Sequence, residues 1–219
     1  MRTIALVTQK GGSGKSTLAA CLAVAAMEAR EKVFLVDMDP QQSLLKWSAI
    51  RNDKDIPVEV ITAAKLPRAL AALEQNGIGL VIIDTPGTDS VAAEAAMKTA
   101  DLCIIPARPT AFDIWSSEQT RTKLKALGKE YVFALNQCPA MQDSPRVQDG
   151  AKALEVMGGL LTPLIASRVD YQEAAREGMG VTELNPNGKA AEEMRALWSS
   201  LRRRLARLKA AGKPVRQVA

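Results

Sequence analysis

The sequence contains no histidine and few aromatic residues among its 219 positions. Without histidine, the chain cannot form an imidazole general base, a Ser-His-Asp triad or an imidazole-ligated metal site. Any chemistry must rest on carboxylates, lysines, hydroxyl groups, the backbone and a bound cation. Aromatic residues make up 4% and hydrophobic residues 47% of the chain, so we expect a packed core of aliphatic side chains.

Cysteines and long apolar runs are also scarce. The three cysteines, Cys21, Cys103 and Cys138, have no C-x-x-C spacing, which argues against a disulfide scaffold and a zinc site. No apolar run approaches the ~18 residues of a membrane span. A strand predicted from Arg2 leaves no room for a signal peptide. We therefore expect a protein of the cytoplasm.

Apolar strands alternate with helices along the chain, which predicts an α/β fold with a doubly wound, mostly parallel sheet. The predicted strands 32–37 and 80–84 contain apolar runs and end in aspartate, as in parallel strands covered on both faces. Other strands are predicted at 2–8, 58–62, 101–106, 131–135 and 161–166. Helices are predicted at about 15–30, 43–51, 66–75, 90–98, 113–127, 145–157, 171–176 and 190–209, with Asp113 as an N-cap. No linker or repeat interrupts the pattern, so residues 1–219 are expected to form one domain.

A glycine-rich loop lies between the first predicted strand and helix. Its residues are Lys10, Gly11, Gly12, Ser13, Gly14, Lys15, Ser16 and Thr17. Strand, glycine loop and helix are the context of a phosphate-binding loop, in which backbone N–H groups and the helix N-terminus surround anionic oxygens. Lys15 is expected on the β- and γ-phosphates and Ser16 on Mg²⁺. The sequence therefore predicts an ATP site.

The loop departs from the usual pattern because Gln9 replaces the first glycine and Lys10 follows it. This form resembles the deviant Walker A box of the ParA/MinD family of P-loop ATPases. The resemblance implies that the chain forms a homodimer with ATP. It also implies that Lys10 reaches across the dimer interface to the nucleotide of the other subunit.

Two acidic motifs complete the predicted site. Asp84 ends an apolar strand, which is the Walker B arrangement, and is expected to hold the Mg²⁺ shell. Asp39 lies in Asp37-Met38-Asp39-Pro40-Gln41, which resembles the D-x-D-P-Q box of ParA proteins. That resemblance implies that Asp39 lies near Mg²⁺ and positions the attacking water. Asp37 is expected to support the loop and the metal shell. For both acids, and equally so for Asp37, the alternative is a role only in capping a helix start. No glutamine equivalent to a GTPase water-positioning residue is evident, so intrinsic hydrolysis is expected to be slow.

Three further segments extend the resemblance. The turn 85–87 follows the Walker B strand, where P-loop switches often sense the γ-phosphate. Asn136 ends a strand where the family has an adenine contact, although a simple turn role is equally open. The loop 106–113 resembles the proline-rich element of small ParF-like partition ATPases. These small ParA proteins lack an N-terminal DNA-binding domain, and a partner of the ParB or centromere-binding type stimulates their hydrolysis.

Basic residues are concentrated at the end of the chain. From residue 190 onward eight Lys and Arg face two Glu, which gives +6, so the formal charge of +5 leaves −1 for the preceding residues. Apolar residues from Met194 to Leu208 recur at spacings of three and four, which predicts an amphipathic helix at about 190–211. Such a helix either packs on the core with a solvated basic face or binds a polyanion through phosphate contacts.

The resemblance adds two expectations for this region. ParA dimers with bound ATP bind DNA non-specifically through late basic residues, which implies contacts here at Arg168, Lys189, Arg202, Arg203, Arg204 and Arg207, and association with the nucleoid. MinD instead binds lipid through a C-terminal amphipathic segment. The polar, proline-broken stretch 212–219 disfavours that membrane alternative. A metabolic P-loop enzyme or cluster-bearing reductase is a third class, which the unpaired cysteines disfavour.

Overall fold

The computed structural model describes residues 1–52, 54–140 and 144–210. Its centre is a six-stranded sheet of order β3-β2-β4-β1-β5-β6, in which all pairs are parallel. The strands are β1 (Arg2–Leu6), β2 (Val33–Asp37), β3 (Val58–Val60), β4 (Leu80–Asp84), β5 (Leu102–Ala107) and β6 (Tyr131–Leu135). The predicted fold class is confirmed, and the carboxyl ends of the central strands form one edge where ligands of such sheets bind.

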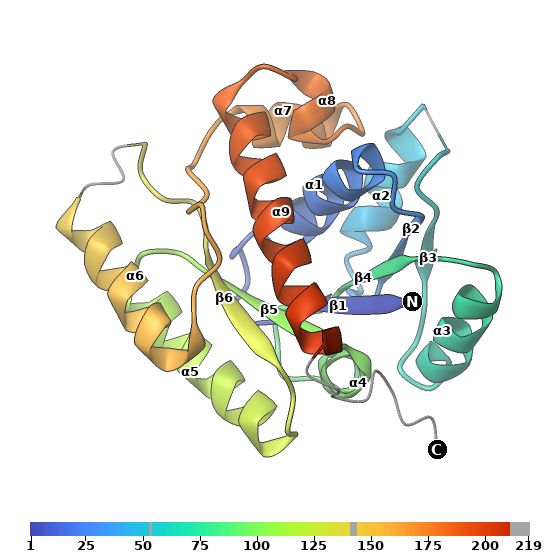
Figure 1. The fold of residues 1–219 in the computed structure, drawn as a ribbon, viewed down its shortest axis with the longest axis horizontal. Helices are drawn as coiled ribbons and strands as arrows, with labels where there is room; N and C mark the ends of the chain where they lie inside the picture. Colours follow the sequence, from blue (N-terminus) through green and yellow to red (C-terminus); the bar gives the residue numbers. More distant parts are fainter. Residues whose placement is uncertain (53, 141–143, 211–219) are drawn as a thin grey trace.

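Helices cover both faces of the sheet (Figure 1). Side chains of successive strand residues point to opposite faces, so Ile4 and Leu6 join one core cluster while Ala5 and Val7 join the other. The first face is covered by α1 (Lys15–Glu28), α2 (Ser43–Ile50), α7 (Asp170–Arg176), α8 (Val181–Leu184) and α9 (Lys189–Ala210). The second is covered by α3 (Leu66–Gln75), α4 (Val91–Thr99), α5 (Ala111–Ala126) and α6 (Pro145–Gly158).

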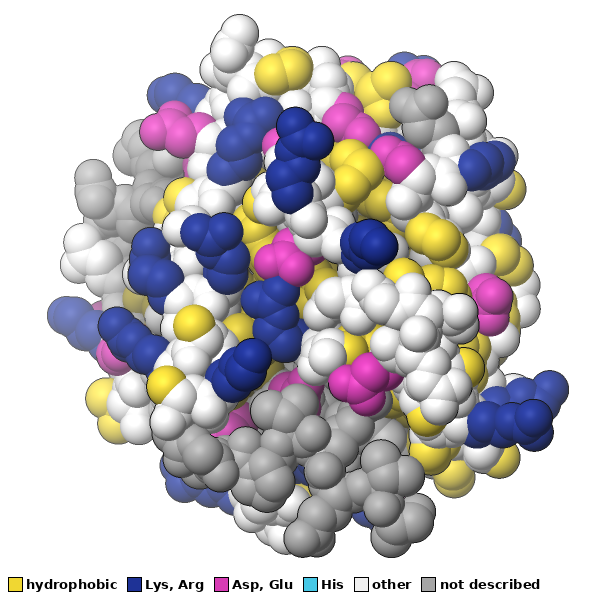
Figure 2. Space-filling model, turned by 45° about the vertical axis from the view of Figure 1, so that its right-hand side comes forward, with side chains coloured by type: hydrophobic (Ala, Val, Ile, Leu, Met, Phe, Trp, Pro, Cys, Tyr) yellow, Lys and Arg dark blue, Asp and Glu magenta, His cyan; other side chains and the backbone are white. Residues whose placement is uncertain are grey.

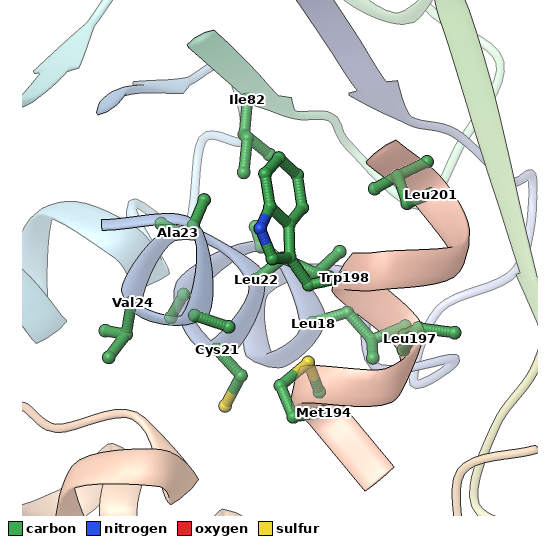
Figure 3. Close-up of a cluster of buried hydrophobic side chains, with 14 of the residues drawn as sticks. Leu18, Cys21, Leu22, Ala23, Val24, Ile82, Met194, Leu197, Trp198 and Leu201 are labelled. Atoms are coloured by element: carbon green, nitrogen blue, oxygen red, sulfur yellow. The ribbon is translucent and has the colours of Figure 1, made fainter. Parts of the chain in front are cut away.

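Helix α9 crosses the first face and packs on α1. Its predicted apolar stripe is buried: Trp198 lies among side chains of α1 and Ile82 of β4 (Figure 3), and Met194, Leu197 and Leu201 are at most 1% exposed. The basic residues of α9 lie on its outer side, and Lys and Arg side chains gather on this face of the molecule (Figure 2). The stretch 212–219 lies outside the described residues.

One predicted strand is wrong. Residues 161–166 run beside β6, but the described chain makes only two isolated bridges there, Phe133 with Leu160 and Cys138 with Ala166. Pro163 has no N–H to donate to a strand ladder, which explains why a continuous strand does not form. The short helix α8 was not predicted, because four residues carry no periodic signal.

The predicted start of α5 is also wrong. The N-cap is Thr110, whose Oγ1 accepts from the N–H of Asp113. Asp113 lies in the first turn, where its carboxylate binds Arg108 and accepts from Thr110 Oγ1 at 2.7 Å. An acid in the first turn and an acid at the N-cap both favour a helix start, so the sequence alone does not show which of the two positions Asp113 occupies.

Among the described residues, no helix is long and apolar enough to cross a bilayer.

Candidate nucleotide-binding site

The predicted phosphate-binding loop connects β1 to α1 at the carboxyl edge of the sheet. Gly12 and Gly14 adopt φ values of +74° and +88°, and Gly14 is the N-cap of α1. Other residues are strained in this left-handed region, so glycine is required where the chain turns into the helix. The N-terminus of α1 consequently faces the loop, in the arrangement that binds phosphate oxygens.

Lys15, Ser16 and Asp84 come together beneath this loop. Lys15 is buried, and its Nζ donates to the carbonyl of Lys10 at 3.5 Å. Ser16 Oγ donates to Asp84 Oδ2 at 2.5 Å, while the buried Asp84 Oδ1 has no hydrogen-bond partner in the described part of the chain. Lys10 itself is half-buried at the start of the loop.

Burial controls the protonation of these groups. It raises the pKa of Asp84 to about 7, although the hydrogen bond from Ser16 acts in the opposite direction. Burial also lowers the pKa of Lys15, against the attraction of Asp84 and Asp39. A cation placed beside Asp84 would provide the missing partner for Oδ1 and favour the carboxylate.

The two aspartates of the D-x-D-P-Q box have different surroundings. Asp37 ends β2 directly opposite Asp84 of β4. Its Oδ2 accepts from the N–H groups of Leu44 and Leu45, so it caps the start of α2, and burial raises its pKa. Asp39 is half-buried and its Oδ1 accepts from the N–H of Gln41. Asp39 therefore stays at the surface of the groove, whereas Asp37 supports the loop from below.

The end of β6 holds the phosphate-binding loop from the other side. Asn136 Nδ2 donates to the carbonyl of Ser13 at 2.9 Å, and Gln137 Nε2 donates to that of Gly12 at 2.9 Å. A Cβ on Gly14 would come within 2.4 Å of Asn136 Nδ2. Asn136 was predicted at the adenine and here contacts the loop backbone. Gln137 was missed, and its position after a strand at the carboxyl edge was the available signal.

The turn after β4 packs directly against the loop. Thr85 Oγ1 donates to the carbonyl of Leu6 at 2.7 Å. A Cβ on Gly87 would lie 3.0 Å from Gly11 Cα and 3.3 Å from Lys15 Nζ. Any group that enters between the turn and the loop must therefore contact both.

The phosphate-binding loop and the turn after β4 border a groove of about 740 Å³. The loop glycines, Lys15, Ser16 and Thr17 line one side, and Asp39 and Gly87 lie across from them. The groove continues along α2, where Lys46, Trp47 and Ile50 line it, and reaches Ala175 of α7. A volume of this size lies within the range of small-molecule and cofactor sites.

The donor set fits Mg²⁺. Ser16, Asp39 and Asp84 offer hydroxyl and carboxylate oxygens, the ligands that Mg²⁺ prefers. Among the described residues, no group of three or more His, Cys, Asp or Glu could hold a metal alone. Mg²⁺ is commonly bound by one or two carboxylates together with substrate phosphates, and Asp39 and Asp84 would supply the carboxylates here.

The predicted DNA-binding residues fall at two ends of α9. Lys189 is exposed at its start, while Arg168 is bound to Glu193 of α9. Arg202, Arg203 and Arg207 are exposed near its end. Arg204 is half-buried and donates to the carbonyl of Tyr131, where β6 begins. The arginines near the end of α9 therefore lie toward the amino ends of the strands, away from the phosphate-binding loop.

Two exposed aromatic residues lie near the start of α5, which begins within the predicted loop 106–113. Phe112 and Trp115 are 71% and 61% exposed, with ring centroids 5.5 Å apart in an edge-to-face arrangement. The loop itself is held by the Arg108–Asp113 ion pair.

The chain is similar to known nucleotide-binding proteins. A family model, the CobQ/CobB/MinD/ParA nucleotide binding domain, matches residues 4–212. Maintenance of carboxysome distribution protein A from Halothiobacillus neapolitanus is 28% identical over 200 residues, which cover 87% of this chain and 91% of that protein.

Solved structures of lower identity share the fold. Apo McdA from Cyanthece has a TM-score of 0.78 at 17% identity and covers 92% of this chain and 99% of its own. The septum site-determining protein MinD from Pyrococcus horikoshii, complexed with Mg-ADP, has a TM-score of 0.75 at 22% identity and covers 96% and 97%. The predicted P-loop architecture is confirmed.

Proposed function

Because the chain belongs to the CobQ/CobB/MinD/ParA family of nucleotide-binding domains, we propose that it is a ParA-like ATPase that positions a cargo by a nucleotide switch. ATP and Mg²⁺ join two subunits, and Lys10 of each reaches the nucleotide held by the other. The dimer binds DNA non-specifically. A partner of the ParB or centromere-binding type stimulates hydrolysis to ADP and phosphate, after which the subunits separate and release the DNA.

One observation carries the nucleotide part of this proposal. Lys15, the Ser16–Asp84 pair and Gly87 surround the end of a glycine loop at the N-terminus of α1. In P-loop proteins a lysine at this place neutralises the β- and γ-phosphates, and the hydroxyl and acid hold Mg²⁺. We assign these roles to Lys15, Ser16 and Asp84, and the positioning of the attacking water to Asp39.

The DNA part rests on the basic outer side of α9. This helix has 22 residues, so it is about 33 Å long. That length is close to one turn of B-DNA, ~34 Å. Exposed Lys189 at its start and exposed Arg202 and Arg207 near its end can contact phosphates without reading bases. Two copies in a dimer would double the number of contacts and raise the avidity.

A MinD-like membrane cycle is the alternative. We do not expect α9 to bind lipid in such a cycle. The apolar stripe of this helix is buried in the core, with Trp198 4% exposed. A membrane-binding helix must present its apolar side to lipid. The name of the Halothiobacillus relative refers to carboxysome distribution, which supports a protein assembly as cargo beside a plasmid or chromosome.

Binding to random-sequence duplex DNA tests the proposal. The full chain is titrated with ATP and Mg²⁺, with ADP or without nucleotide, over a series of salt concentrations. We expect binding only with ATP and a fall in affinity as salt rises, because phosphate contacts release counterions. Equal binding in all three states would contradict the switch. Absence of DNA binding, together with ATP-dependent binding to anionic vesicles, would support the MinD-like alternative.

A further inference from the structure

Helix α2 begins at the acidic loop of the nucleotide site. Asp37 accepts from the N–H groups of Leu44 and Leu45 at 3.0 and 3.1 Å, and from that of Asp39 at 3.1 Å. The helix has eight residues, or about two turns, and so moves as one short rigid body. A shift of the loop that carries Asp39 therefore shifts the start of α2.

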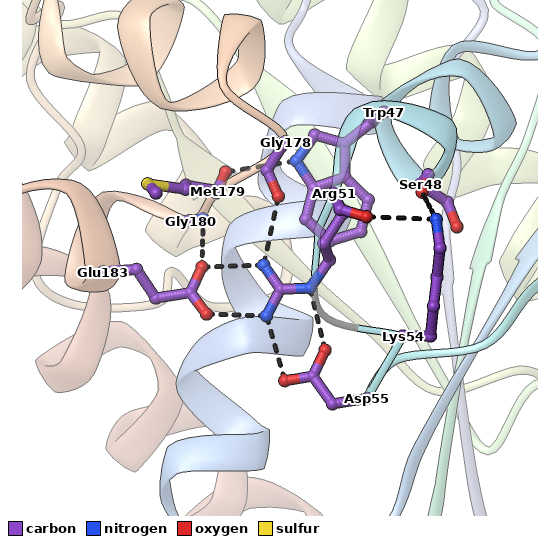
Figure 4. A network of polar contacts seen from close by, with 9 residues as sticks. All are labelled: Trp47, Ser48, Arg51, Lys54, Asp55, Gly178, Met179, Gly180 and Glu183. Carbon is purple, nitrogen blue, oxygen red and sulfur yellow. Dashed lines mark hydrogen bonds and ion pairs between the residues drawn. The ribbon is translucent and has the colours of Figure 1, made fainter.

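The other end of α2 is attached to the loop before α8. Trp47 Nε1 donates to the carbonyl of Met179 at 3.1 Å, and Arg51 Nη1 donates to that of Gly178 at 3.0 Å (Figure 4). Gly178 has φ +67°, and a Cβ there would come within 2.5 Å of the backbone nitrogen of Arg51. The two backbones touch with no side chain between them, so neither can shift alone.

Arg51 is the centre of this attachment. It is 4% exposed, and all five of its N–H donors are used: two on Asp55, two on Glu183 and one on Gly178. Its side chain also lies over the Trp47 ring, at 5.3 Å from the centroid. Only a guanidinium can serve both carboxylates and a carbonyl in this way, because lysine has three donors on a single nitrogen.

The contacts continue from α8 to α9. Glu183, which binds Arg51, is part of α8 and also accepts from the N–H of Gly180. Arg195 of α9 donates to the carbonyl of Pro186 at 2.6 Å and to that of Thr182 at 3.3 Å. Hydrogen bonds and the backbones of α2 and α8 thus connect Asp37 to the basic helix. Residues of this helix that lie far from the phosphate-binding loop are proposed to bind DNA.

We propose that Arg51 is a positioning residue that transmits the nucleotide state of the acidic loop, through α2 and α8, to helix α9. The inference rests on the ATP switch proposed above. Arg51 is absent from the groove lining, whereas Trp47, on which its guanidinium lies, is part of it. Arg51 therefore acts through the position of α2 and not through contact with the nucleotide.

Amide hydrogen exchange of the full chain tests this coupling without DNA. Exchange is measured with and without a non-hydrolysable ATP analogue and Mg²⁺, in the wild type, Arg51→Lys and Glu183→Gln. In the wild type we expect the analogue to slow exchange in the phosphate-binding loop and in residues 178–184. In both variants the slowing should remain in the loop and be lost in 178–184, because the connection is broken while nucleotide binding persists.

Arg121→Gln is the matched control. Arg121 is half-buried and donates to Tyr131 and to the carbonyl of Met157 on the other face of the sheet. It should behave as the wild type. Retention of the 178–184 response in Arg51→Lys, its absence in the wild type, or its equal loss in Arg121→Gln would each overturn the inference. If Arg51→Lys does not fold, Glu183→Gln, which keeps the shape of its side chain, decides.

A DNA measurement separates this inference from the proposed function. If the wild type binds DNA with ATP, Arg51→Lys should reduce the ratio of affinities with ATP and ADP from about tenfold or more toward one. If the wild type binds no DNA, the proposed function fails and the exchange result still decides the coupling. An unchanged affinity ratio in Arg51→Lys would contradict the coupling.

Discussion

At the scale of the residue, Asp84 is a carboxyl group placed where solvent does not reach it. Burial raises its pKa to about 7, while a carboxyl in an unfolded chain ionises near 4. Between these values the folded protein binds the proton more strongly than the unfolded chain, so the free energy of unfolding falls as the pH rises. Above about pH 7 both states are ionised, and the folded state carries the full cost of the buried charge.

We predict that Asp84→Asn stabilises the nucleotide-free protein in a pH-dependent manner. At pH 8 the gain should reach roughly 4 kcal/mol, because a shift of three pKa units corresponds to about that free energy. Below about pH 4 the gain should vanish. Denaturant titrations at several pH values measure it, and a gain that is equal at pH 4 and pH 8 would contradict the assignment. The same variant should bind ATP with less dependence on Mg²⁺.

Gly87 gives a second prediction at this scale. Gly87→Ala places a methyl group 3.0 Å from Gly11 Cα and 3.3 Å from Lys15 Nζ, which forces the turn away from the phosphate-binding loop. We expect a loss of ATP affinity of about tenfold or more, since misplacement by 1 Å is already costly in such sites. Nucleotide titration measures it, with Asp89→Ala as the control, because Asp89 is exposed and does not line the groove. Equal affinity in both variants would show that the turn does not contact the nucleotide.

At the scale of the element, the two sides of α9 have different roles: one packs on the core and the other carries exposed basic residues. Trp198→Ala should destabilise the fold by ~3–5 kcal/mol, because it leaves a cavity against α1 and β4. Arg202→Gln with Arg207→Gln should change stability by less than about 0.5 kcal/mol, because both side chains are exposed.

Thermal unfolding and DNA titration of these α9 variants check the assignment. The arginine variant should keep ATP binding, lose DNA affinity and show a shallower salt dependence, since each lost phosphate contact reduces the salt slope by about one. Undiminished DNA affinity in that variant would place the DNA contacts elsewhere.

Most elements could be predicted because their signals are local. Apolar runs such as 80–84 gave the central strands, and the glycine pattern of 10–17 gave the loop. The segment 161–166 misled because its composition resembles a strand while Pro163 prevents the ladder. Gln137 had only its position after a strand as a signal, and Arg51 and Glu183 had no signal in the sequence. Their partners lie 125 and 132 positions away, and only the folded chain brings them together.

At the scale of the whole molecule, the proposed dimer depends on Lys10. Lys10→Gln should leave nucleotide binding to a single subunit nearly unchanged, because Lys15 and Ser16 remain in place, but should prevent ATP-dependent dimerisation.

Asp39→Ala should have the opposite effect and trap the ATP-bound dimer, because hydrolysis stalls. Sedimentation velocity with ATP distinguishes the two. Rapid turnover in Asp39→Ala, or dimers of Lys10→Gln, would count against these roles.

The two amides at the end of β6 have a consequence for the thermodynamics of nucleotide association. Because Asn136 and Gln137 already hold the carbonyls of Ser13 and Gly12, the loop has its shape before ligand arrives. Little conformational entropy then remains to be lost on association. Calorimetry should therefore show a small heat-capacity change, without the signature of coupled folding. Association of ATP should be fast. Dissociation of the nucleotide is then the step that determines how long each subunit remains bound to it.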